Sequence, residues 1–251
     1  MYRWCLFLLA AAVSACATSP LGRSQVMLVG DGQMAEMGVA AYRDMQKKMP
    51  ATKDAKVSGY VNCVTSAITR EVGGNNWEVT VFDDKQVNAF ALPGGKIGVY
   101  TGLLSVAKNQ DQLATVIGHE IAHVLAKHGA ERVSEGMLAQ GVTQAAGAAT
   151  GYDPQIFGMA TDILFLKPHS RAQESEGDLL GLDLMSKAGF DPRQAPVLWQ
   201  NMSKGGGNKP PELLSTHPSD STRIQQLTNR LPNAMPLYEN AQASGKSPRC
   251  G

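Results

Sequence analysis

Apolar side chains recur with helical spacing through most of the chain. The segment from Asp31 to Met49 reads as a helix, and we interpret its methionines at positions 34, 37, 45 and 49 as core packing. A second helix should end at Gly73-Gly74-Asn75, where glycine breaks the pattern. Its apolar positions are Val57, Tyr60, Val61, Val64 and Ile68.

A different pattern lies between residues 77 and 100. Three short segments are rich in β-branched and aromatic residues and alternate between apolar and polar positions, with turns at Asp83-Asp84 and Pro93-Gly94-Gly95. They run from Trp77 to Phe82, from Val87 to Leu92 and from Lys96 to Tyr100. This alternation predicts a small antiparallel sheet.

Helical segments resume after the sheet. They run from about Gln112 to Val133, from Arg171 to Gly189, from Asp191-Pro192 through Met202, and through Arg223. We therefore predict an α+β fold, mainly helical, with the small sheet beside the helix at 112–133.

The composition fits one globular domain with short extensions. The chain has 251 residues, of which 43% are hydrophobic, and this is enough for a core. Its 23 basic side chains nearly balance its 22 acidic ones. That balance argues against a nucleic-acid binder, which usually carries a basic excess.

The N-terminus predicts an exported lipoprotein. An apolar run from Cys5 to Val13 follows a short basic start and is too short to span a bilayer. Val13-Ser14-Ala15-Cys16 resembles a bacterial lipobox, so residues 1–15 would be a signal peptide, Cys16 would be lipidated and residues 16–30 would form a tether. Ala17 after that cysteine implies the outer membrane, facing the periplasm. The alternative is an ordinary secretory signal with a chance cysteine.

Two cysteines remain if Cys5 is removed and Cys16 is lipidated. In an oxidising compartment, Cys63 and Cys250 would form a disulfide that ties the C-terminal tail to the first core helix. The alternative is a buried Cys63 and a free thiol at Cys250. We interpret neither as a metal ligand.

Candidate chemistry concentrates in one stretch, Gly118-His119-Glu120-Ile121-Ala122-His123. Helical residues four apart lie on one face, so His119 and His123 offer two imidazole nitrogens to one cation, with Glu120 beside them. Zinc accepts nitrogen and carboxylate ligands, and it is catalytic when three protein ligands leave one position to water. The alternative is a chance pattern on a charged helix.

A third ligand must come from another element, because the same helix cannot wrap around the ion. Ser170 and Gln173 form a capping-box signature for a helix that places Glu174 and Asp178 on one face. We assign Glu174 to the metal and Asp178 to a hydrogen bond from the far nitrogen of a ligand histidine. Glu176 is a competitor, but it points about 200° around the helix from Glu174, and we interpret it as solvated or structural. The alternative is an ordinary acidic helix start.

These motifs resemble a known family. His119-Glu120-x-x-His123 followed by Glu174-x-x-x-Asp178 resembles the gluzincin peptidases that include CAAX prenyl proteases, HtpX-type heat-shock proteases and their soluble periplasmic relatives. Val87 to Gly95, and Ser215-Thr216-His217-Pro218-Ser219 followed by Arg223, resemble further segments of the family in the same order. The resemblance covers roughly residues 55 to 232 and implies zinc-dependent endopeptidase activity, with one Zn2+ per chain.

The resemblance also implies how a substrate binds. Asn88, Ala89 and Phe90 would lie on an edge strand that pairs with the backbone of an extended substrate. Phe90 as a plain core residue is the other interpretation. Pairing through backbone groups predicts locally unfolded substrates and weak sequence preference.

Two late residues have several interpretations. His217 would stabilise the oxyanion, occupy the open metal position in a resting state, or simply order its loop. Arg223 would be a second electrophile, would position His217 or Asp178, or would face solvent.

The remaining histidines and the Ala/Gly-rich stretch receive structural interpretations. His128 lies five residues after His123, so we interpret it as a surface or capping group; His169 should belong to a loop or a helix cap. Residues 137–159 are interpreted as a mobile cover over the cleft. The alternatives are a pair of loosely packed helices and a stretch that touches the membrane. We expect the peptidase domain to span residues 31–232, with a tail at 233–251.

The mechanistic hypothesis follows from the metal motif. Glu120 would act as the general base toward a water activated by zinc held by His119, His123 and Glu174. Substrates would be unfolded or misassembled envelope proteins, with the outer membrane reached through the lipid anchor and its protein-assembly machinery as a candidate partner. The rival function is a lipoprotein chaperone that uses the same cleft with little proteolysis. A zinc enzyme acting on a non-peptide bond is a weaker rival, because the edge strand suits a peptide backbone.

Overall fold

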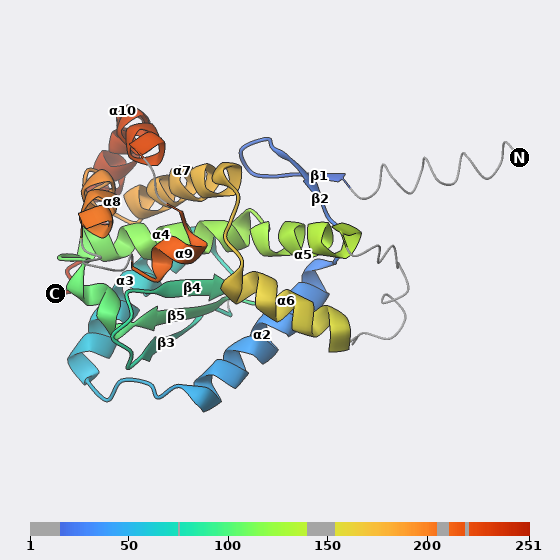
Figure 1. Cartoon of the computed structure of the whole chain (residues 1–251). Coiled ribbons are helices and arrows are strands. Elements are labelled where there is room, and N and C mark those ends of the chain that lie inside the picture. Colours follow the sequence, from blue (N-terminus) through green and yellow to red (C-terminus); the bar gives the residue numbers. More distant parts are fainter. Residues whose placement is uncertain (1–15, 75, 140–153, 205–210, 219–220) are drawn as a thin grey trace, which may run out of the picture.

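A computed structural model describes residues 16–74, 76–139, 154–204, 211–218 and 221–251 (Figure 1). The expected signal peptide, residues 1–15, lies outside the described residues, and so does most of the stretch interpreted as a mobile cover, residues 140–153. Within the described part of the chain, no helix combines the length and the apolar character that crossing a membrane requires.

Helices form most of the described structure, and local sequence sets where several of them begin. Asp54 accepts hydrogen bonds from the backbone N–H groups of Lys56 and Val57, and Ser170 forms a full capping box with Gln173. The helices are α2 (Asp31–Lys48), α3 (Ala55–Val72), α4 (Gln110–Leu125), α5 (His128–Ala139), α6 (Pro154–Leu166), α7 (Arg171–Lys187), α8 (Gln194–Lys204), α9 (Leu213–Thr216) and α10 (Ser221–Ala243), with a 3-10 helix η1 (Thr101–Ser105).

The sheet beside these helices has three strands in the order β3-β5-β4. They are β3 (Glu78–Phe82), β4 (Ala89–Leu92) and β5 (Lys96–Tyr100). The predicted α+β class, mainly helical with a small sheet, is confirmed.

The strand directions differ in part from the prediction. The tight turn at Gly94 and Gly95, both with positive φ, makes β4 and β5 antiparallel. Strand β3 instead pairs with the other edge of β5 and runs parallel to it, so the sheet is mixed. The loop between β3 and β4 carries the chain past the position of β5, and β4 is therefore an edge strand.

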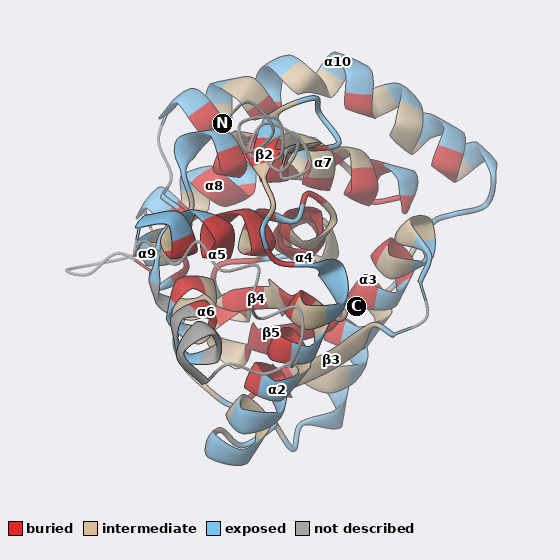
Figure 2. Cartoon of the chain, turned by 90° about the vertical axis from the view of Figure 1, so that its right-hand side faces the viewer, coloured by how far each residue is buried: buried red, intermediate tan, exposed pale blue. Residues whose placement is uncertain are grey.

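Helix α4 lies at the centre of the molecule. Figures 1 and 2 show α7 along one side of it and β4 along the other. Every residue from Gln112 to His123 is buried, so the candidate metal motif lies inside the core. Glycines bring α7 close: a Cβ at Gly181 would meet the backbone N of His119 at 2.7 Å, and one at Gly118 would meet the carbonyl oxygen of Gly181 at 2.8 Å.

The predicted helix from Gln112 to Val133 is divided in two. Helix α4 ends at Leu125 and α5 begins at His128, because Lys127 adopts a left-handed conformation with φ 55°. This break interrupts the helical repeat, so residues after it do not follow the face predicted by continuous helical spacing.

The segment expected to be a tether packs against the domain. Strands β1 (Cys16–Thr18) and β2 (Ser24–Val26) form an antiparallel hairpin. The buried Gln25 side chain donates a hydrogen bond to the carbonyl oxygen of Ala126 at 2.7 Å. The backbone N–H of Leu28 donates a hydrogen bond to the Ser134 hydroxyl on α5 at 2.8 Å. These contacts hold the segment in place, and a free tether would have none. Cys16 begins the first strand.

The C-terminal segment also belongs to the folded domain. Helix α10 continues through Pro232 and Pro236 to Ala243 and packs on α7, so the boundary expected at Pro232 is corrected. Buried Ala234 and Ala241 show that packing maintains the helix past both prolines.

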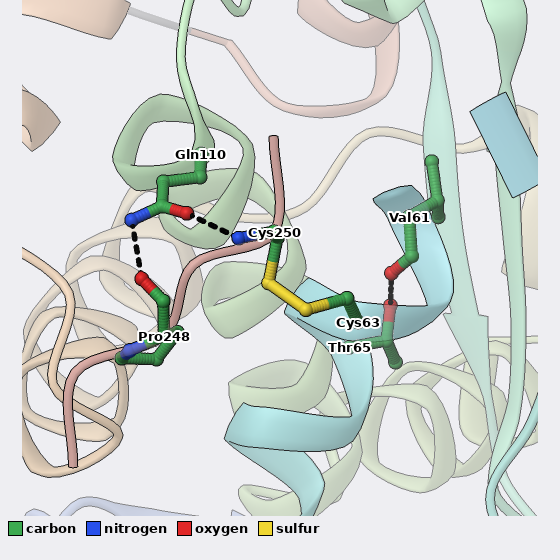
Figure 3. The surroundings of a disulfide bond; sticks show 6 residues. All are labelled: Val61, Cys63, Thr65, Gln110, Pro248 and Cys250. Atoms are coloured by element: carbon green, nitrogen blue, oxygen red, sulfur yellow. Dashed lines mark hydrogen bonds between the residues drawn. A yellow bond between two sulfur atoms is a disulfide. The ribbon is translucent and has the colours of Figure 1, made fainter. Parts of the chain in front are cut away.

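A disulfide then joins Cys250 to Cys63 on α3 (Figure 3). Beside it, the Gln110 side chain accepts a hydrogen bond from the Cys250 backbone N–H and donates one to the carbonyl oxygen of Pro248. The last residues are therefore fixed to the first turn of α4.

Candidate metal centre

Three side chains of the central helix face a buried site. His119 and His123 lie one turn apart on α4, and their Nε2 atoms are 3.0 Å apart. Glu120 lies beside them, and all three residues are at most 5% exposed. The helical spacing predicted this pair, and the surrounding core removes it from water.

Helix α7 places a carboxylate on the same point. Glu174, only 1% exposed, has its carboxylate oxygens 3.5 Å from the Nε2 atom of His119 and 3.5 Å from that of His123. The capping box at Ser170 starts α7 one turn earlier and so sets the position of Glu174. Two separate helices thus contribute to one cluster.

His217 completes the cluster from the residue after α9. Its Nδ1 atom lies 3.0 Å from Glu174 Oε1 and 3.2 Å from His119 Nε2. One nitrogen or oxygen atom from each of His119, His123, Glu174 and His217 lies within 4.8 Å of the others, and all four residues are buried.

This donor set fits a zinc ion. Two imidazole Nε2 atoms face each other at 3.0 Å, and their far Nδ1 atoms lie against other groups, 3.1 Å from Asp178 Oδ1 for His119 and 2.7 Å from His128 Nδ1 for His123. If the protons sit on the Nδ1 atoms, both lone pairs point at one buried position together with a carboxylate. A cation removes that repulsion, and nitrogen and carboxylate ligands in this number are those of zinc.

The protonation states are set by burial and by neighbouring charges. Burial and the surrounding imidazoles hold the pKa of His123 well below its usual value, so this ring is neutral. Burial also opposes ionisation of Glu174, but the charges of His217 and His119 outweigh it and lower its pKa. For His119, burial is outweighed by Asp178 and Glu174, which raise its pKa to about 9 in the absence of a metal. A metal must therefore displace a proton from His119.

Asp178 and Arg223 support this cluster from behind. The Arg223 guanidinium donates hydrogen bonds to both oxygens of Asp178, at 2.7 and 2.8 Å, and its Nη1 atom lies 2.6 Å from Glu174 Oε2. Arg223 also lies over the ring of Trp199, at 4.3 Å. Its guanidinium is occupied by these partners, so it holds two carboxylates in place and does not face solvent.

Glu120 is next to the cluster and has its own environment. One of its oxygens lies 3.5 Å from His217 Nε2. Burial raises the pKa of Glu120, although the backbone N–H of Ala91 and the nearby imidazoles lower it in part. A raised pKa moves this carboxyl toward neutral pH, as proton transfer at that pH requires.

A cavity of about 650 Å³ opens on this site. Glu120, His123 and His217 line one part of it, and Asn88, Ala89 and Phe90 line another. The three residues expected to bind substrate therefore border the same cavity as the cluster. Phe90 is also packed: its ring lies 5.3 Å from that of Phe165, and it is 8% exposed.

His128, interpreted as a surface or capping group, and Glu176, interpreted as solvated or structural, are both buried here. His128 is 0% exposed, and its Nε2 atom lies 3.1 Å from Oε2 of Glu176, which is itself 4% exposed. The prediction of a surface role for His128 was wrong because the break at Lys127 changes the face on which this residue lies, and its ring packs between His123 and Glu176. Glu176 does point away from Glu174, but that direction leads to α5 and not to solvent.

All five histidines of the chain gather at this site. The ring of His169, expected in a loop, lies 4.1 Å from that of His123 and 4.8 Å from that of His217. Its backbone N–H donates a hydrogen bond to the carbonyl oxygen of Thr216. The sequence has only five histidines, and this small number was the one available hint that they share a site. Their convergence depends on how α5, α7 and α9 pack.

Comparisons with known proteins agree on one family. The family model described as Peptidase family M48 matches residues 53–231. The mitochondrial metalloendopeptidase OMA1 of Arabidopsis thaliana is 38% identical over 187 residues, covering 70% of this chain and 36% of that protein. The OMA1 metalloendopeptidase of Homo sapiens is 33% identical over 245 residues, covering 88% and 47%. The beta-barrel assembly-enhancing protease of Escherichia coli is 24% identical over 242 residues, covering 91% and 50%.

The chain therefore spans between about a third and a half of the length of these relatives. The comparisons also correct one prediction. The relatives with the higher identity bear mitochondrial names, so the expected location as a lipoprotein of a bacterial outer membrane is wrong.

Proposed function

Because the chain belongs to peptidase family M48, and is by that membership a zinc metallopeptidase, we propose that it is an endopeptidase that cleaves unfolded or misassembled proteins. The observation that carries this proposal is the buried convergence of His119, His123 and Glu174 beside Glu120, at the end of a cavity bordered by an edge strand.

We propose that His119, His123 and Glu174 hold the zinc ion. When bound there, zinc supplies Lewis-acid chemistry: it polarises a carbonyl and lowers the pKa of water toward about 7. The chain's own residues supply the rest of the reaction. The distances of 3.0 to 3.5 Å among the three donor groups support this assignment.

Glu120 is proposed as the general base. Its carboxylate would accept a proton from the attacking water and then donate it to the leaving nitrogen of the cleaved peptide bond. The pKa raised by burial favours both transfers near neutral pH. Substituting the amide of glutamine would keep the size of the side chain and remove the proton acceptor.

His217 is proposed to control the open position of the site. Its Nδ1 atom lies among the donor atoms, and its Nε2 atom lies 3.5 Å from Glu120. In this arrangement it occupies the position that a substrate carbonyl would need, which supports the resting-state interpretation. If a rotation or a loop displacement moved the imidazole aside, it would be able to donate a hydrogen bond to an oxyanion.

Arg223 is proposed to position other groups and not to act as an electrophile. Its contacts with Asp178, Glu174 and the carbonyl oxygen of Pro218 connect α7 to the loop that carries His217.

Strand β4 is proposed to bind the substrate backbone. The backbone N–H of Tyr100 donates a hydrogen bond to the carbonyl oxygen of Asn88, the residue before β4. This bond fixes which residues of β4 direct their backbone groups toward β5. By the alternation of an antiparallel ladder, Ala89 and Ala91 turn their backbone groups away from β5. An extended polypeptide can add to this edge beside Glu120, and such pairing reads backbone more than side chains. This geometry favours unfolded protein segments as substrates.

The experiment compares the parent with Glu120→Gln and a matched control, Glu36→Gln, which changes an exposed carboxylate on α2. We measure zinc content and the digestion of casein, with and without a chelator. The parent and Glu36→Gln should each hold one zinc and digest casein until the chelator is added. Glu120→Gln should keep zinc and lose about 10²-fold or more in rate.

If Glu120→Gln cleaved casein at the parent rate, Glu120 would not be the general base. A parent that holds zinc and binds unfolded protein without cleaving it would favour the chaperone function instead.

A further inference from the structure

The metal ligand His123 has no carboxylate directly behind it. His119 has one, since its Nδ1 atom lies 3.1 Å from Asp178. The Nδ1 atom of His123 instead lies 2.7 Å from Nδ1 of His128, whose ring is fully buried. The group that contacts the other nitrogen of His128 therefore determines whether His128 Nδ1 accepts or donates a hydrogen bond toward His123.

We propose that His128, Glu176 and Arg23 form a relay that positions His123 for metal binding, and that the N-terminal hairpin thereby belongs to the metal site. The relay continues from His128 Nε2 to Glu176 Oε2 at 3.1 Å, and Arg23 Nε donates to the same oxygen at 3.1 Å. The family model begins only at residue 53, so Arg23 lies outside the matched region, whereas His128 and Glu176 lie inside it.

Hydrogen-bond direction is consistent along the whole relay. If His123 binds metal through Nε2, its proton lies on Nδ1 and must be donated to His128 Nδ1. His128 must then carry its own proton on Nε2 and donate it to Glu176. A carboxylate only accepts hydrogen bonds, and Glu176 also accepts them from Arg23 Nε and from the backbone N–H of Leu21 at 3.2 Å. One assignment of protons satisfies every contact.

Arg23 is held firmly enough to serve as the end of this relay. Its terminal nitrogens donate to both oxygens of Glu131 on α5, one of them at 2.6 Å. Gln25 and Gln173 donate to the same carboxylate at 3.2 and 2.8 Å. One guanidinium thus bridges two buried carboxylates, Glu131 of α5 and Glu176 of α7. These contacts fix Glu176, which fixes the ring of His128.

The relay makes His128, Glu176 and Arg23 positioning residues, which act through His123 and do not touch the substrate. Partners of this kind orient a ligand ring and select its tautomer, and losing one typically weakens metal binding by about 10- to 100-fold. The inference rests on the assignment of His123 as a zinc ligand in the proposed function.

The test uses the full chain loaded with zinc and measures zinc affinity by competition with a fluorescent chelator. His128→Phe should weaken zinc binding by about 10- to 100-fold, since phenylalanine accepts no hydrogen bond. His128→Gln offers both an acceptor and a donor, and it should restore part of the affinity. Arg23→Gln should weaken binding in the same direction. In the cobalt-substituted protein, the visible absorption bands of these variants should shift, because the ligand geometry changes.

Arg230→Gln is the matched control. Arg230 is bound to Asp183 on the same helix as Glu176, and its side chain is 33% exposed against 26% for Arg23. Both arginine variants should lower the unfolding temperature of the zinc-free protein. Only Arg23→Gln should alter zinc affinity and the cobalt spectrum.

A measurement on the parent protein keeps the proposal testable if a variant fails to fold. Long-range proton–nitrogen NMR spectra of the histidines in the zinc-loaded parent should show His128 with its proton on Nε2. A proton on Nδ1, or on both nitrogens, would overturn the relay. So would a folded His128→Phe that binds zinc like the parent. A parent that binds no zinc at all would instead refute the metal assignment on which the relay rests.

Discussion

Two of the buried carboxylates at this site, Glu174 and Asp178, have charged partners that offset the cost of their burial. An isolated charge in a protein interior is costly, yet Glu120, Glu174 and Asp178 are all at most 3% exposed. Burial opposes ionisation of Asp178, but the charge and hydrogen bonds of Arg223 outweigh it and lower its pKa. The imidazoles do the same for Glu174. The carboxylates are thus prepared to face a cation before one arrives.

Gly177 leaves the space in which the metal must fit. A Cβ at this position would lie 2.9 Å from Nε2 of His123 and 3.1 Å from Cε1 of His119. We predict that Gly177→Ala loses most of its zinc, because the methyl group blocks the nitrogen that faces the metal. Without zinc, the free energy of unfolding of the variant should lie within about 1–3 kcal/mol of that of the parent, which is the usual cost of overpacking. Metal analysis and denaturant unfolding check this; full zinc occupancy in the variant would contradict it.

Glu131 gives the protein a predictable acid sensitivity. Burial alone would raise its pKa, but hydrogen bonds from Arg23, Gln173 and Gln25 lower it overall. A folded-state pKa below the unfolded value means that this carboxylate stabilises the fold above the unfolded pKa, about 4.3. That contribution is lost as the pH falls through the lower, folded-state pKa.

We therefore predict that Glu131→Gln lowers the free energy of unfolding by about 1–2 kcal/mol at pH 7. The difference from the parent should shrink progressively once the pH falls below about 4.3. Urea unfolding of the zinc-free proteins over pH 3 to 7 measures this difference in the free energy of unfolding. Using zinc-free proteins avoids the effect of metal release at low pH. A difference that is the same at every pH would show that the charge of Glu131 is not the cause.

At the scale of elements, the site depends on how closely α7 approaches α4. The Cβ that Gly181 lacks would meet the backbone N of His119 at 2.7 Å. This backbone contact between α7 and α4 sets how close Glu174 and Asp178 lie to the imidazoles of α4. The helix spacing is therefore part of the metal site, although Gly181 carries no chemistry.

Gly181→Ala should force the two helices apart. We predict a loss of about 1–3 kcal/mol in the free energy of unfolding, together with weaker zinc binding. Gly59→Ala is the matched control, since Gly59 is exposed in α3 and a Cβ there meets nothing within 4 Å. That substitution should stabilise the protein by about 0.5–1 kcal/mol and leave zinc affinity unchanged. If the two substitutions changed zinc affinity equally, the spacing between α4 and α7 would not be what controls zinc binding.

At the scale of the whole molecule, the first and the last segments that the structure describes are both attached to the helices around the metal site or to α4 itself. The N-terminal hairpin reaches α5 and α7 through Arg23. The C-terminal end reaches α3 through Cys250 and the first turn of α4 through Gln110 (Figure 3). The hairpin and the disulfide lie toward opposite ends of the described structure (Figure 1).

The disulfide should contribute to global stability through the length of chain it closes. Its cysteines are 187 residues apart, and cross-linking a long loop restricts the unfolded chain most. We predict that Cys250→Ser lowers the free energy of unfolding by about 2–5 kcal/mol. The double variant with Cys63→Ser should lose no more than the single one, because both remove the same bond. Losses that add in the double variant would show that packing of the thiols, and not the bond, provides the stability.

The sequence by itself determined the local parts of this protein. Helical spacing placed His119 and His123 on one face, the capping box placed Glu174 and Asp178 on a later helix, and the order of motifs identified the family, which the match over residues 53–231 confirms. The spacing and the capping box depend on neighbours within a few residues, for which helix geometry is fixed.

Tertiary structure alone decided what surrounds those parts. One left-handed residue, Lys127, turned His128 from an apparent surface group into the neighbour of His123. The parallel pairing of β3 with β5, and the attachment of Arg23 to Glu176, join residues far apart in the chain. Periodicity describes the face that a residue occupies on its own element; which element covers that face depends on packing and on the burial of charge.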